Sequence, residues 1–501
     1  MKIFISYPPL ESAKGIPLLT QNRQFQWFNS PTYIYPMVPA SAATLLARNG
    51  YGVVWDDAIA EGKSYAAWLA NVKREKPDLI VLETKTPVVK RHWRIIDELK
   101  KESLEIGNWK LEIVLIGDHV TALPEESLSN SQVDYVLTGG DYDFMLLNLA
   151  NHLAKDEALE PGWYFRSAKG KAQNAKLTAG DICTTGKFQL NHDLDSLPMI
   201  DRELTKWELY AYRNGNYKQV PSTYVMSARD CWWGKCSFCS WTTIFPGAHF
   251  RARSPKLMLD EIGLLIERYG VKEIMDDSGS LPIGGWLREF CQGMIERGYS
   301  EKVRLNCNMR LNALNQEEYD LMGRAGFRFV LYGLESANQA TLDKVNKNLK
   351  VEEMEPGVRM AKRAGLDPHI TAMVGYPWET YEDAQRTVEL AKCLFKKGYV
   401  DTLQATIVIP YPGTPYFKEC RDNGWLKTTD WDRYDMREAV VKTPLTDGQI
   451  KELTQGLYKS FLSPQFIVRK ILSVRSWADV KFILRAGKKV LGHLLDFRKR
   501  G

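Results

Sequence analysis

Three cysteines lie within nine residues of one another near the middle of the chain. Cys231, Cys236 and Cys239 occur in the segment CWWGKCSFC, directly after an apolar run that predicts a strand. Three thiolates on one loop can bind one soft metal centre. On a four-iron cluster, three such ligands leave one iron open to a substrate, which suits an enzyme that delivers electrons.

A structural zinc ion is the alternative for this loop. Such a site needs four ligands, and the nearest further cysteines, Cys183 and Cys291, are about 50 residues away. His249 is a closer candidate. The remaining cysteines, Cys307, Cys393 and Cys420, are scattered, and we expect them to be small buried apolar residues.

Strand and helix signals alternate from residue 223 onward, so that the cysteines follow the first strand of a series. The predicted strands are 225–228, 273–275, 303–306, 329–332, 370–374 and 403–409. Ser254-Pro255 predicts a helix start, and Thr380 to Asp383 a capping box. Six strand–helix units predict a complete or partial barrel, whose active site lies at the carboxyl ends of its strands.

This arrangement resembles the radical S-adenosylmethionine (SAM) enzymes, in which a C-x-x-x-C-x-aromatic-C segment opens a β/α barrel. The first spacing here is C-x4-C, one residue longer. Further segments similar to the family's follow the predicted strands: Asp276-Asp277-Ser278, 306–310, 333–336, 374–380 and 411–415. The resemblance covers residues 220–420 and implies a 4Fe-4S cluster on the three cysteines. It implies SAM contacts from Phe238, Asp276, Asp277, Ser278, Asn308, Arg310, Glu335 and Ser336.

Residues 1–150 also alternate, with predicted strands 2–6, 53–56, 78–82, 111–116 and 134–137. This pattern predicts a doubly wound parallel sheet, in which ligands bind beyond the carboxyl ends of the strands. The phosphate-binding patterns GxGxxG and GxxxxGK[ST] are absent from this region, which disfavours those two kinds of nucleotide site.

Two segments at these strand ends resemble the flavodoxin-like cobalamin-binding domain that often precedes a radical SAM barrel. Residues 115–125 are similar to its Gly-Gly-Pro-His-x-Thr-x-x-Pro-Glu segment, and 134–141 to its Asp-x-Val-x-x-Gly-Glu segment. The resemblance implies cobalamin contacts from Gly117, Asp118, His119, Thr121, Thr138, Gly139 and Gly140. The D-x-H-x-x-G motif is absent, so His119 is either an axial cobalt ligand or a loop histidine that lines the cofactor.

The resemblance implies an enzyme with three cofactors: a 4Fe-4S cluster, SAM and cobalamin. The cluster reduces SAM to give a 5′-deoxyadenosyl radical, which removes a hydrogen atom from the substrate, and cobalamin supplies a methyl group. The leading hypothesis is therefore a cobalamin-dependent C-methyltransferase acting on an unactivated carbon. A cyclase or C–C bond-forming enzyme of the same architecture is the alternative, and a non-catalytic iron–sulfur or zinc module is a third.

The expected domains are a cobalamin-binding domain (1–150), a connector (151–220), a radical SAM barrel (221–425) and a helical C-terminal segment (426–501). Residues 465–501 carry ten basic and two acidic residues, a net charge of +8, which leaves −2 for residues 1–464. Apolar residues recur there at helical spacing. The segment is either a helix docked on the barrel or an amphipathic tail on an anionic membrane surface.

The remaining expectations concern partners and location. We expect a small-molecule or lipid-like substrate and an electron donor such as ferredoxin or flavodoxin. Nucleic acid is disfavoured because the chain has no RNP1-like or zinc-finger pattern. The N-terminal MKIFISYPPLES predicts a first strand rather than a signal peptide, and no apolar run of about 18 residues occurs. These features predict a cytoplasmic protein with reduced cysteines, which is either free or peripheral on the inner face of the membrane.

Overall fold

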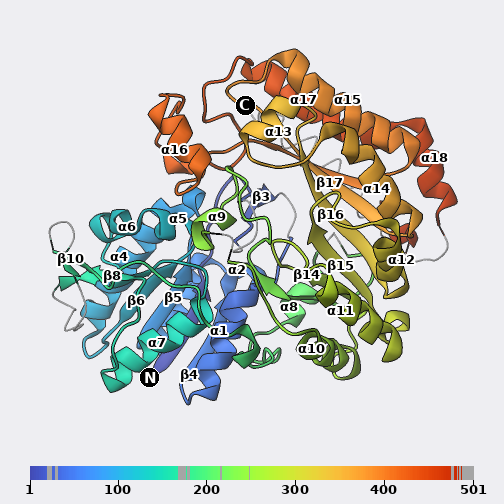
Figure 1. Cartoon of the computed structure of the whole chain (residues 1–501). Helices are drawn as coiled ribbons and strands as arrows, with labels where there is room; N and C mark the ends of the chain where they lie inside the picture. Colours follow the sequence, from blue (N-terminus) through green and yellow to red (C-terminus); the bar gives the residue numbers. More distant parts are fainter. Residues whose placement is uncertain are drawn as a thin grey trace.

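Two sheets lie side by side in the computed structural model, each covered by helices (Figure 1). The structure describes residues 1–19, 25–28, 32–167, 176–177, 181–214, 217–247, 249–474, 479–481, 483–484 and 487. The N-terminal sheet and the barrel sheet meet along the middle of the molecule, where the segment after the first barrel strand crosses between them.

The first sheet has eight strands in the order β4-β1-β5-β6-β7-β8-β10-β9. Its bounds are β1 (Lys2–Tyr7), β4 (Gly52–Asp57), β5 (Leu79–Glu83), β6 (Glu112–Ile116), β7 (Tyr135–Leu137), β8 (Trp163–Arg166), β9 (Lys176–Leu177) and β10 (Ile182–Thr184). The first five strands are parallel, and β5 is buried along its whole length, as the continuous apolar run predicts. The strand order reverses between β1 and β5, which places a topological switch point at their carboxyl ends.

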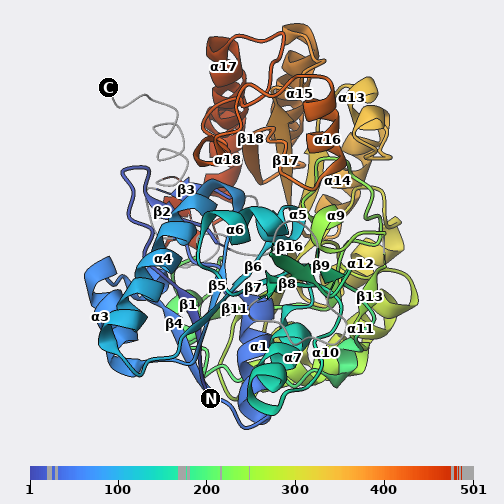
Figure 2. The same cartoon turned by 90° about the vertical axis from the view of Figure 1, so that its left-hand side faces the viewer.

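Helices cover both faces of this sheet, which confirms the doubly wound prediction. They are α1 (Met37–Arg48), α2 (Ala58–Glu61), α3 (Tyr65–Glu75), α4 (Val89–Ile106), α5 (Asp118–Ala122), α6 (Pro124–Asn130) and α7 (Tyr142–Lys155). Figure 2 shows α1 and α7 together on one side of the strands and α3 and α4 on the other. A short hairpin of β2 (Ile16–Pro17) and β3 (Trp27–Phe28) interrupts the connection from β1 to α1.

The sheet extends beyond residue 150 into the segment predicted as a connector. There β8 pairs antiparallel with β7, and β10 pairs antiparallel with β8. These strands are only three or four residues long, and partners distant in sequence set such edge pairings more than local propensity does. Farther along the segment, the buried Arg202 guanidinium binds Glu261 at 3.1 Å and Thr223 at 2.8 Å in the barrel domain, whereas Tyr210 of α8 (Glu208–Ala211) accepts from the Trp55 indole of β4 at 3.1 Å, so this part contacts both sheets.

The second sheet confirms the predicted partial barrel of six parallel strands. Their order is β11 (Ser222–Val225), β14 (Glu273–Asp276), β15 (Arg304–Met309), β16 (Phe327–Glu335), β17 (Asp367–Val374) and β18 (Thr402–Ile407). The outer helices are α10 (Pro255–Glu267), α11 (Gly285–Glu296), α12 (Gln316–Arg324), α13 (Gln339–Lys344), α14 (Met354–Arg363), α15 (Tyr381–Lys397) and α16 (Pro415–Asp422). The predicted capping box at Thr380 is present, and Pro255 occupies the first turn of α10, although the Ser254 side chain makes no capping bond there.

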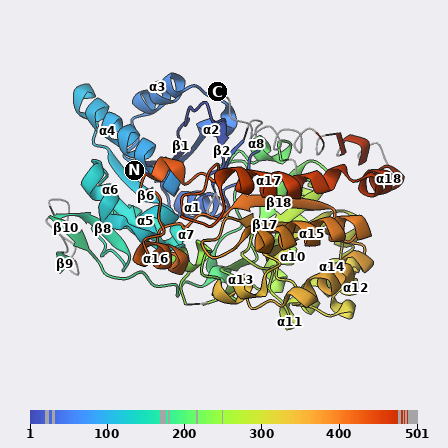
Figure 3. The ribbon, with the colours of Figure 1, turned by 90° about the horizontal axis from the view of Figure 1, so that it is seen from above.

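Two α-helices lie within residues 426–474, all of which the structure describes. The helix α17 (Asp447–Tyr458) covers the open edge of the barrel, and the Tyr458 hydroxyl donates to the Ala405 carbonyl of β18 at 3.1 Å (Figure 3). The helix α18 (Pro464–Leu472) follows at the end of the barrel far from the first sheet. Among the described residues, no helix has the length and apolar character needed to span a bilayer.

Candidate active site

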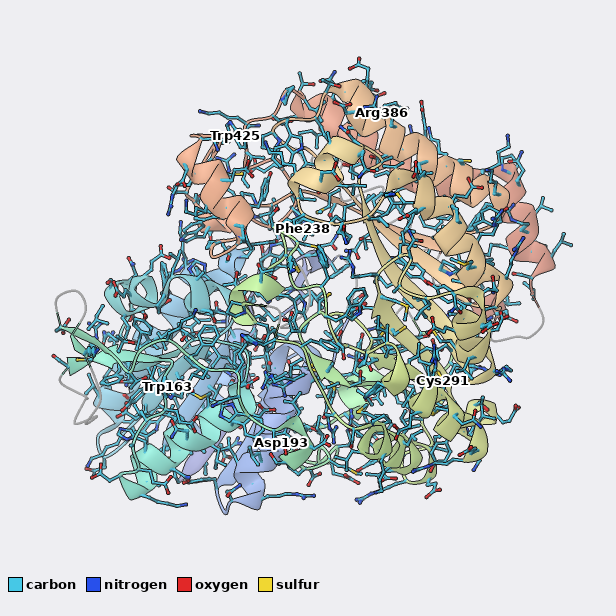
Figure 4. All side chains as sticks on the ribbon, in the orientation of Figure 1. Trp163, Asp193, Phe238, Cys291, Arg386 and Trp425 are labelled. Atoms are coloured by element: carbon cyan, nitrogen blue, oxygen red, sulfur yellow. The ribbon has the colours of Figure 1, made fainter. Side chains whose placement is uncertain are left out.

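The three cysteines lie on a closed loop, residues 230–250, which we call the cysteine loop. The strands β12 (Ala228–Arg229) and β13 (Arg251–Ala252) pair antiparallel and join the two ends of this loop. Asp230 has a left-handed backbone (φ 75°) that turns the chain into the loop. Figure 4 shows Phe238, from the middle of the loop, between the two sheets.

The three thiols are free and close enough to influence one another. Burial raises the pKa of Cys239 strongly, and the neighbouring Cys236 and Cys231 raise it further. Burial likewise raises the pKa of Cys236, and Cys231 again contributes. A positively charged metal centre would lower the pKa of these thiols, because a cysteine binds a metal as the deprotonated thiolate.

Buried polar atoms without a protein partner gather around the same loop. They are Asp230 Oδ2, Trp232 Nε1, Ser237 Oγ and, from the segment after β17, Tyr376 Oη. Burying such atoms unpaired is costly, so their presence fits a site that a polar ligand completes. The loop therefore offers sulfur ligands for a cluster and hydrogen-bonding groups for a small molecule beside it.

The residues suggested for zinc are not assembled in the structure. Cys183 lies in β10 of the first sheet, and Cys291 lies in α11 on the outside of the barrel, well away from Phe238 (Figure 4). His249 is exposed. Among the described residues, no three His, Cys, Asp or Glu side chains, the three loop cysteines included, are arranged around a single ion.

Four of the predicted SAM residues join the ends of β11, β14 and β15. The Asp276 carboxylate accepts from the Ser278 amide at 3.0 Å and from the Ser227 amide at 3.3 Å. The Ser278 hydroxyl accepts from the Ala228 amide at 2.9 Å, and its carbonyl accepts from the Asn308 amide group at 2.8 Å. The Asp277 amide donates to the Val225 carbonyl at 2.8 Å. These bonds fix the entry of the cysteine loop against the barrel edge.

Arg310 lies directly against the cysteine loop. One guanidinium nitrogen is 3.9 Å from Cys236 Sγ, and the group lies over the rings of Trp232 and Trp233. Its other terminal nitrogen donates to the Lys347 carbonyl.

Glu335 and Lys347 form a buried ion pair beside the loop. Their side chains are 2.8 Å apart, and the ammonium group lies 5.9 Å from the Phe238 ring. Burial opposes the charge on Lys347, yet its pKa is raised because Glu335, and to a smaller extent Cys236, favour the charged ammonium group. Ser336 donates to Glu379 at 2.7 Å, which ties the ends of β16 and β17 together. Sequence reasoning missed Lys347, a lysine in a loop with no motif to mark it.

The predicted cobalamin residues lie at the carboxyl edge of the first sheet, but most of their polar groups bind the protein itself. Gly117 (φ 132°) is required because a Cβ there would lie 2.1 Å from the Thr84 carbonyl oxygen. The Thr121 hydroxyl donates to the Gly117 carbonyl at 2.7 Å and accepts from the Gly139 amide at 3.2 Å. The Thr138 hydroxyl donates to Gly162, also at 2.7 Å.

His119 is fully buried, and both ring nitrogens have protein partners. Nδ1 is 3.1 Å from the Thr86 hydroxyl, and Nε2 is 3.0 Å from the Glu126 carboxylate. Its neighbour Asp118 pairs with Lys85 at 3.0 Å. This geometry favours the second sequence interpretation, a loop histidine, over an axial cobalt ligand.

The atoms free for a ligand at this edge belong to residues that the sequence motifs do not mark. Glu83 ends β5, and Tyr142 begins α7; Glu83 Oε1 and Tyr142 Oη are buried without partners. The other Glu83 oxygen accepts from the Tyr7 hydroxyl at 2.7 Å, across the switch point between β5 and β1. Their only signal in the sequence is their position, because Glu83 ends a strand and Tyr142 begins the helix that follows β7.

A buried charge cluster joins this edge to the cysteine loop. Asp141 binds Arg251 through both oxygens, at 2.7 and 2.8 Å, and Asp143 binds Arg229 at 2.6 Å. His192 adds a 3.0 Å bond to Asp141. Both arginines belong to the β12–β13 pair, so the neck of the cysteine loop is clamped onto the start of α7.

Close packing reinforces this clamp. Phe245 of the cysteine loop lies against Gly140, where an added Cβ would be 2.3 Å from its ring. A Cβ on Gly413, in the segment after β18, would be 2.5 Å from Thr243 and 2.8 Å from Ala122. At these two points there is therefore no room for a further methyl group.

Comparisons with known proteins agree with this geometry. Residues 226–391 match the Radical SAM superfamily. The chain is 25% identical to the uncharacterized methyltransferase PH0819 of Pyrococcus horikoshii, covering 94% of this chain and 95% of that protein. It is 27% identical to the anaerobic magnesium-protoporphyrin IX monomethyl ester cyclase of Cereibacter sphaeroides, covering 89% and 68%.

The fold is also that of a solved structure, the radical SAM methyltransferase TsrM from Kitasatospora setae with cobalamin and a [4Fe-4S] cluster bound. The TM-score is 0.67 at 15% identity, covering 98% of this chain and 99% of that one. The barrel of this chain therefore matches the Radical SAM superfamily, and the chain shares its two-sheet fold with a radical SAM methyltransferase whose solved structure holds cobalamin and a [4Fe-4S] cluster.

Proposed function

We propose that this enzyme is a cobalamin-dependent C-methyltransferase that acts on an unactivated carbon of a hydrophobic small molecule. The observation that carries the proposal is the clamp between Asp141 and Arg251, which holds the cysteine loop against the carboxyl edge of the first sheet. Sites for two cofactors therefore face each other across one interface. A substrate between them could lose hydrogen on one side and receive a methyl group on the other.

The cysteine loop would hold the iron–sulfur cluster. Cys231, Cys236 and Cys239 would bind the 4Fe-4S cluster, and Arg310 would lie against the Cys236 ligand. We assign SAM to the adjacent barrel edge formed by Phe238, Asp276, Asp277, Ser278, Asn308, Arg310, Glu335 and Ser336. The unpartnered Ser237 hydroxyl and Tyr376 hydroxyl are free to bind it.

The carboxyl edge of the first sheet would hold cobalamin. Gly117, Asp118, Thr121, Thr138, Gly139 and Gly140 shape this edge, while Glu83 and Tyr142 offer it unpartnered polar atoms. We assign His119 to the wall of the site because Thr86 and Glu126 engage its ring nitrogens.

When bound, the three cofactors supply a reductive cleavage that yields a hydrogen-abstracting radical, and a transferable methyl group. The chain's own contribution is to position these groups and to exclude water. Trp241, Ile244 and Phe245 are buried between the two cofactor sites, together with the Cys239 side chain. A dry, packed wall of this kind protects a reactive intermediate from side reactions.

A cyclase is the second candidate, because a relative that matches 89% of the chain is named as a porphyrin-ester cyclase. Both candidates suggest a flat or elongated apolar substrate, such as a tetrapyrrole or a lipid. The near-neutral body of residues 1–464 is compatible with such a substrate.

Labelled SAM separates the two candidates. The loaded enzyme is reduced without oxygen in the presence of SAM carrying a deuterated methyl group, and magnesium-protoporphyrin IX monomethyl ester and a lipid extract are supplied as probes. A methyltransferase gives a product that carries the label, whereas a ring-closed product without label overturns the proposal. Cys239→Ser should lower deoxyadenosine formation to background and remove the cluster absorbance, while Cys393→Ser in α15 should change neither.

The C-terminal tail supports a further part of the proposal, contact with an anionic membrane surface. In α18 the apolar side chains Ile467, Val468, Ile471 and Leu472 point to solvent, with Leu472 66% exposed. The basic side chains face the barrel instead: Lys470 pairs with Asp401 at 2.6 Å, and Arg469 donates to the Lys396 carbonyl at 2.6 Å. The apolar face is thus available to lipid, and most of the remaining basic tail residues lie outside the described part of the chain.

A further inference from the structure

The carboxyl end of β16 has an irregular backbone at Glu335. The pairing of β16 with β17 shifts register between Gly333 and Glu335, and Glu335 itself is left-handed, with φ 68°. A residue with a side chain seldom adopts this conformation, and such irregularities occur where a strand redirects a side chain beside a functional site. The irregularity therefore sets the direction of the Glu335 carboxylate.

The two carboxylate oxygens of Glu335 have unequal partners. Oε1 accepts from the Lys347 ammonium at 2.8 Å, whereas the bond that Oε2 accepts from the Thr371 hydroxyl is long, at 3.4 Å. Burial raises the pKa of the nearby Tyr376 hydroxyl, and Glu335 raises it further; this hydroxyl has no partner within the described part of the chain. Glu335 Oε2 and the Tyr376 hydroxyl are therefore available to a ligand with hydroxyl or amino groups, and SAM carries both.

Gly333 leaves the space that the ion pair occupies. A Cβ on Gly333 would lie 2.2 Å from Glu335 Oε1 and 2.5 Å from Lys347 Nζ. Both atoms are the ends of flexible side chains, so a methyl group there would displace the pair and leave the strand in place. The position of the pair thus depends on the absence of a side chain at Gly333.

The backbone around Lys347 is bound by the cysteine loop and by Arg310. The carbonyls of residues 345–348 all accept hydrogen bonds, from the Ser237 amide, the Trp233 indole or the Arg310 guanidinium. The bonds from Ser237 and Trp233 are 3.0 and 2.8 Å long. These contacts fix Lys347 relative to the cysteine loop, so its side chain links that loop to β16.

The burial of this ion pair fits a role that needs its charge. Lys347 is 8% exposed, and lysines are almost never buried unless they are paired. Apolar residues of similar volume often stabilise a protein as well as a buried ion pair does, or better. Stability alone is therefore a weak reason for an ammonium group at this position.

We propose that Lys347 is a positioning residue for SAM: it holds Glu335 Oε1 and thereby directs Oε2 toward a hydrogen-bond donor of the bound SAM. This inference rests on the proposed function, because it assumes the SAM site at the barrel edge. A carboxylate held by an ammonium group keeps one orientation and stays ionised, and an ionised acceptor makes the stronger hydrogen bond. No bond to Lys347 forms or breaks in the reaction.

The test measures SAM binding apart from activity. Labelled SAM is dialysed to equilibrium against the full-length enzyme, with its cluster loaded and kept oxidised so that SAM is not cleaved. We expect Lys347→Met, which removes the ammonium group but keeps most of the side chain, to raise the Kd for SAM by roughly tenfold. In the reduced enzyme, the KM for SAM in deoxyadenosine formation should rise by more than kcat falls.

Gly333→Ala tests the same contact with both charges present. It should also raise the Kd for SAM, because the methyl group displaces the pair. Iron content and cluster absorbance are measured for every variant. If Lys347→Met fails to fold or loses its cluster, Gly333→Ala decides.

A double-variant cycle shows whether Lys347 acts through Glu335. Glu335→Gln alone should raise the Kd for SAM. In that background Lys347→Met should have little further effect, because residues that act as one unit are not additive. Independent, additive effects of the two substitutions would contradict the inference.

The matched control is Lys362→Met in α14. Lys362 is half-buried and pairs with Asp401 at 2.5 Å and with Asp367 at 3.3 Å, where β18 and β17 begin, at the end of the barrel opposite Glu335. This substitution also removes a lysine from an ion pair of the barrel. It should lower the free energy of unfolding but leave the Kd for SAM unchanged.

The remaining outcomes separate the inference from its premise. An unchanged Kd for SAM in Lys347→Met and Gly333→Ala would overturn the inference. An equal rise in Lys362→Met would also overturn it, since the effect would then be one of stability alone. Failure of the unmodified loaded enzyme to bind SAM would instead overturn the proposed function.

Discussion

At position 140 the structure has no room for even one additional carbon atom. Gly140 belongs to the segment that resembles a cobalamin-binding motif, yet Phe245 of the cysteine loop fills the space beside it. We expect Gly140→Ala to destabilise the protein by about 1–3 kcal/mol, because overpacking of a tight contact forces side chains or backbone to move. Chemical denaturation measures the loss. Phe245→Leu in the same chain should recover part of it.

Gly285→Ala is the appropriate control for this prediction. Gly285 begins α11, and nothing lies within 4 Å of a Cβ built on it. Its stability should equal or slightly exceed that of the unmodified protein. Equal stabilities of Gly140→Ala and Gly285→Ala would contradict the packing described here.

Individual residues were predictable from sequence where a motif fixes a position, but not where an interface does. The sequence identifies Cys231, Cys236 and Cys239 as one group, and the structure places them on one loop. For His119 it leaves two roles open, because the bonds to Thr86 and Glu126 depend on how α5 and α6 fold back onto the sheet. The local sequence does not predict such contacts between distant residues.

At the scale of elements, the link between α7, β13 and the segment around His192 depends on pH. Burial opposes protonation of His192, but its bonds to Asp141 and Glu160 outweigh burial and raise its pKa to about 9. A histidine whose pKa is raised by folding stabilises the fold fully below its unfolded pKa of about 6.5. That contribution disappears as pH rises through about 9.

The expected result is a loss of stability between about pH 6.5 and pH 9 that depends on this one side chain. His192→Gln should make the protein less stable near pH 6 and flatten this part of the profile. Denaturation midpoints measured from pH 6 to pH 10 check the prediction. The half-buried His152, whose ring contacts a backbone carbonyl and no carboxylate, gives the control His152→Gln. Parallel profiles for the unmodified protein and His192→Gln would refute the prediction.

Elements with strong periodicity were predicted well, and those defined by tertiary pairing were not. The six barrel strands and the five parallel strands of the first sheet fall within a few residues of their predicted places, because continuous apolar runs and caps mark them. The short strands β8 and β10 were missed, since their polar, glycine-rich surroundings give no alternation to detect. Their pairing with β7 and with each other holds them in the sheet.

At the scale of the whole molecule, the orientation of α18 leaves an apolar face at the surface that could contact a membrane. Its basic side chains are held by the barrel and its apolar side chains face outward. We expect Ile471→Glu with Leu472→Glu to lower co-sedimentation with vesicles containing anionic lipid by at least tenfold, because two charges replace apolar surface that would enter the lipid. Catalysis of a water-dispersed substrate should be unaffected.

Leu104→Glu provides a matched change on another surface. Leu104 lies in α4 of the first domain and is 79% exposed, so the substitution removes a similar apolar side chain elsewhere. Its co-sedimentation should match that of the unmodified enzyme. The proposed membrane contact is wrong if the α18 variant co-sediments with vesicles as well as the unmodified enzyme does. It is also wrong if the unmodified enzyme does not bind the vesicles.

The junction at Gly413, Ala122 and Thr243 also bears on how such enzymes can diversify. Three parts of the chain that are distant in sequence share one crowded point, so neither half can change its contact surface alone. Exchange of the first domain between relatives would therefore fail unless the receiving barrel kept a compatible glycine and a small residue opposite it. New substrates are therefore easier to acquire through substitutions that leave this contact intact than through recombination of the two halves.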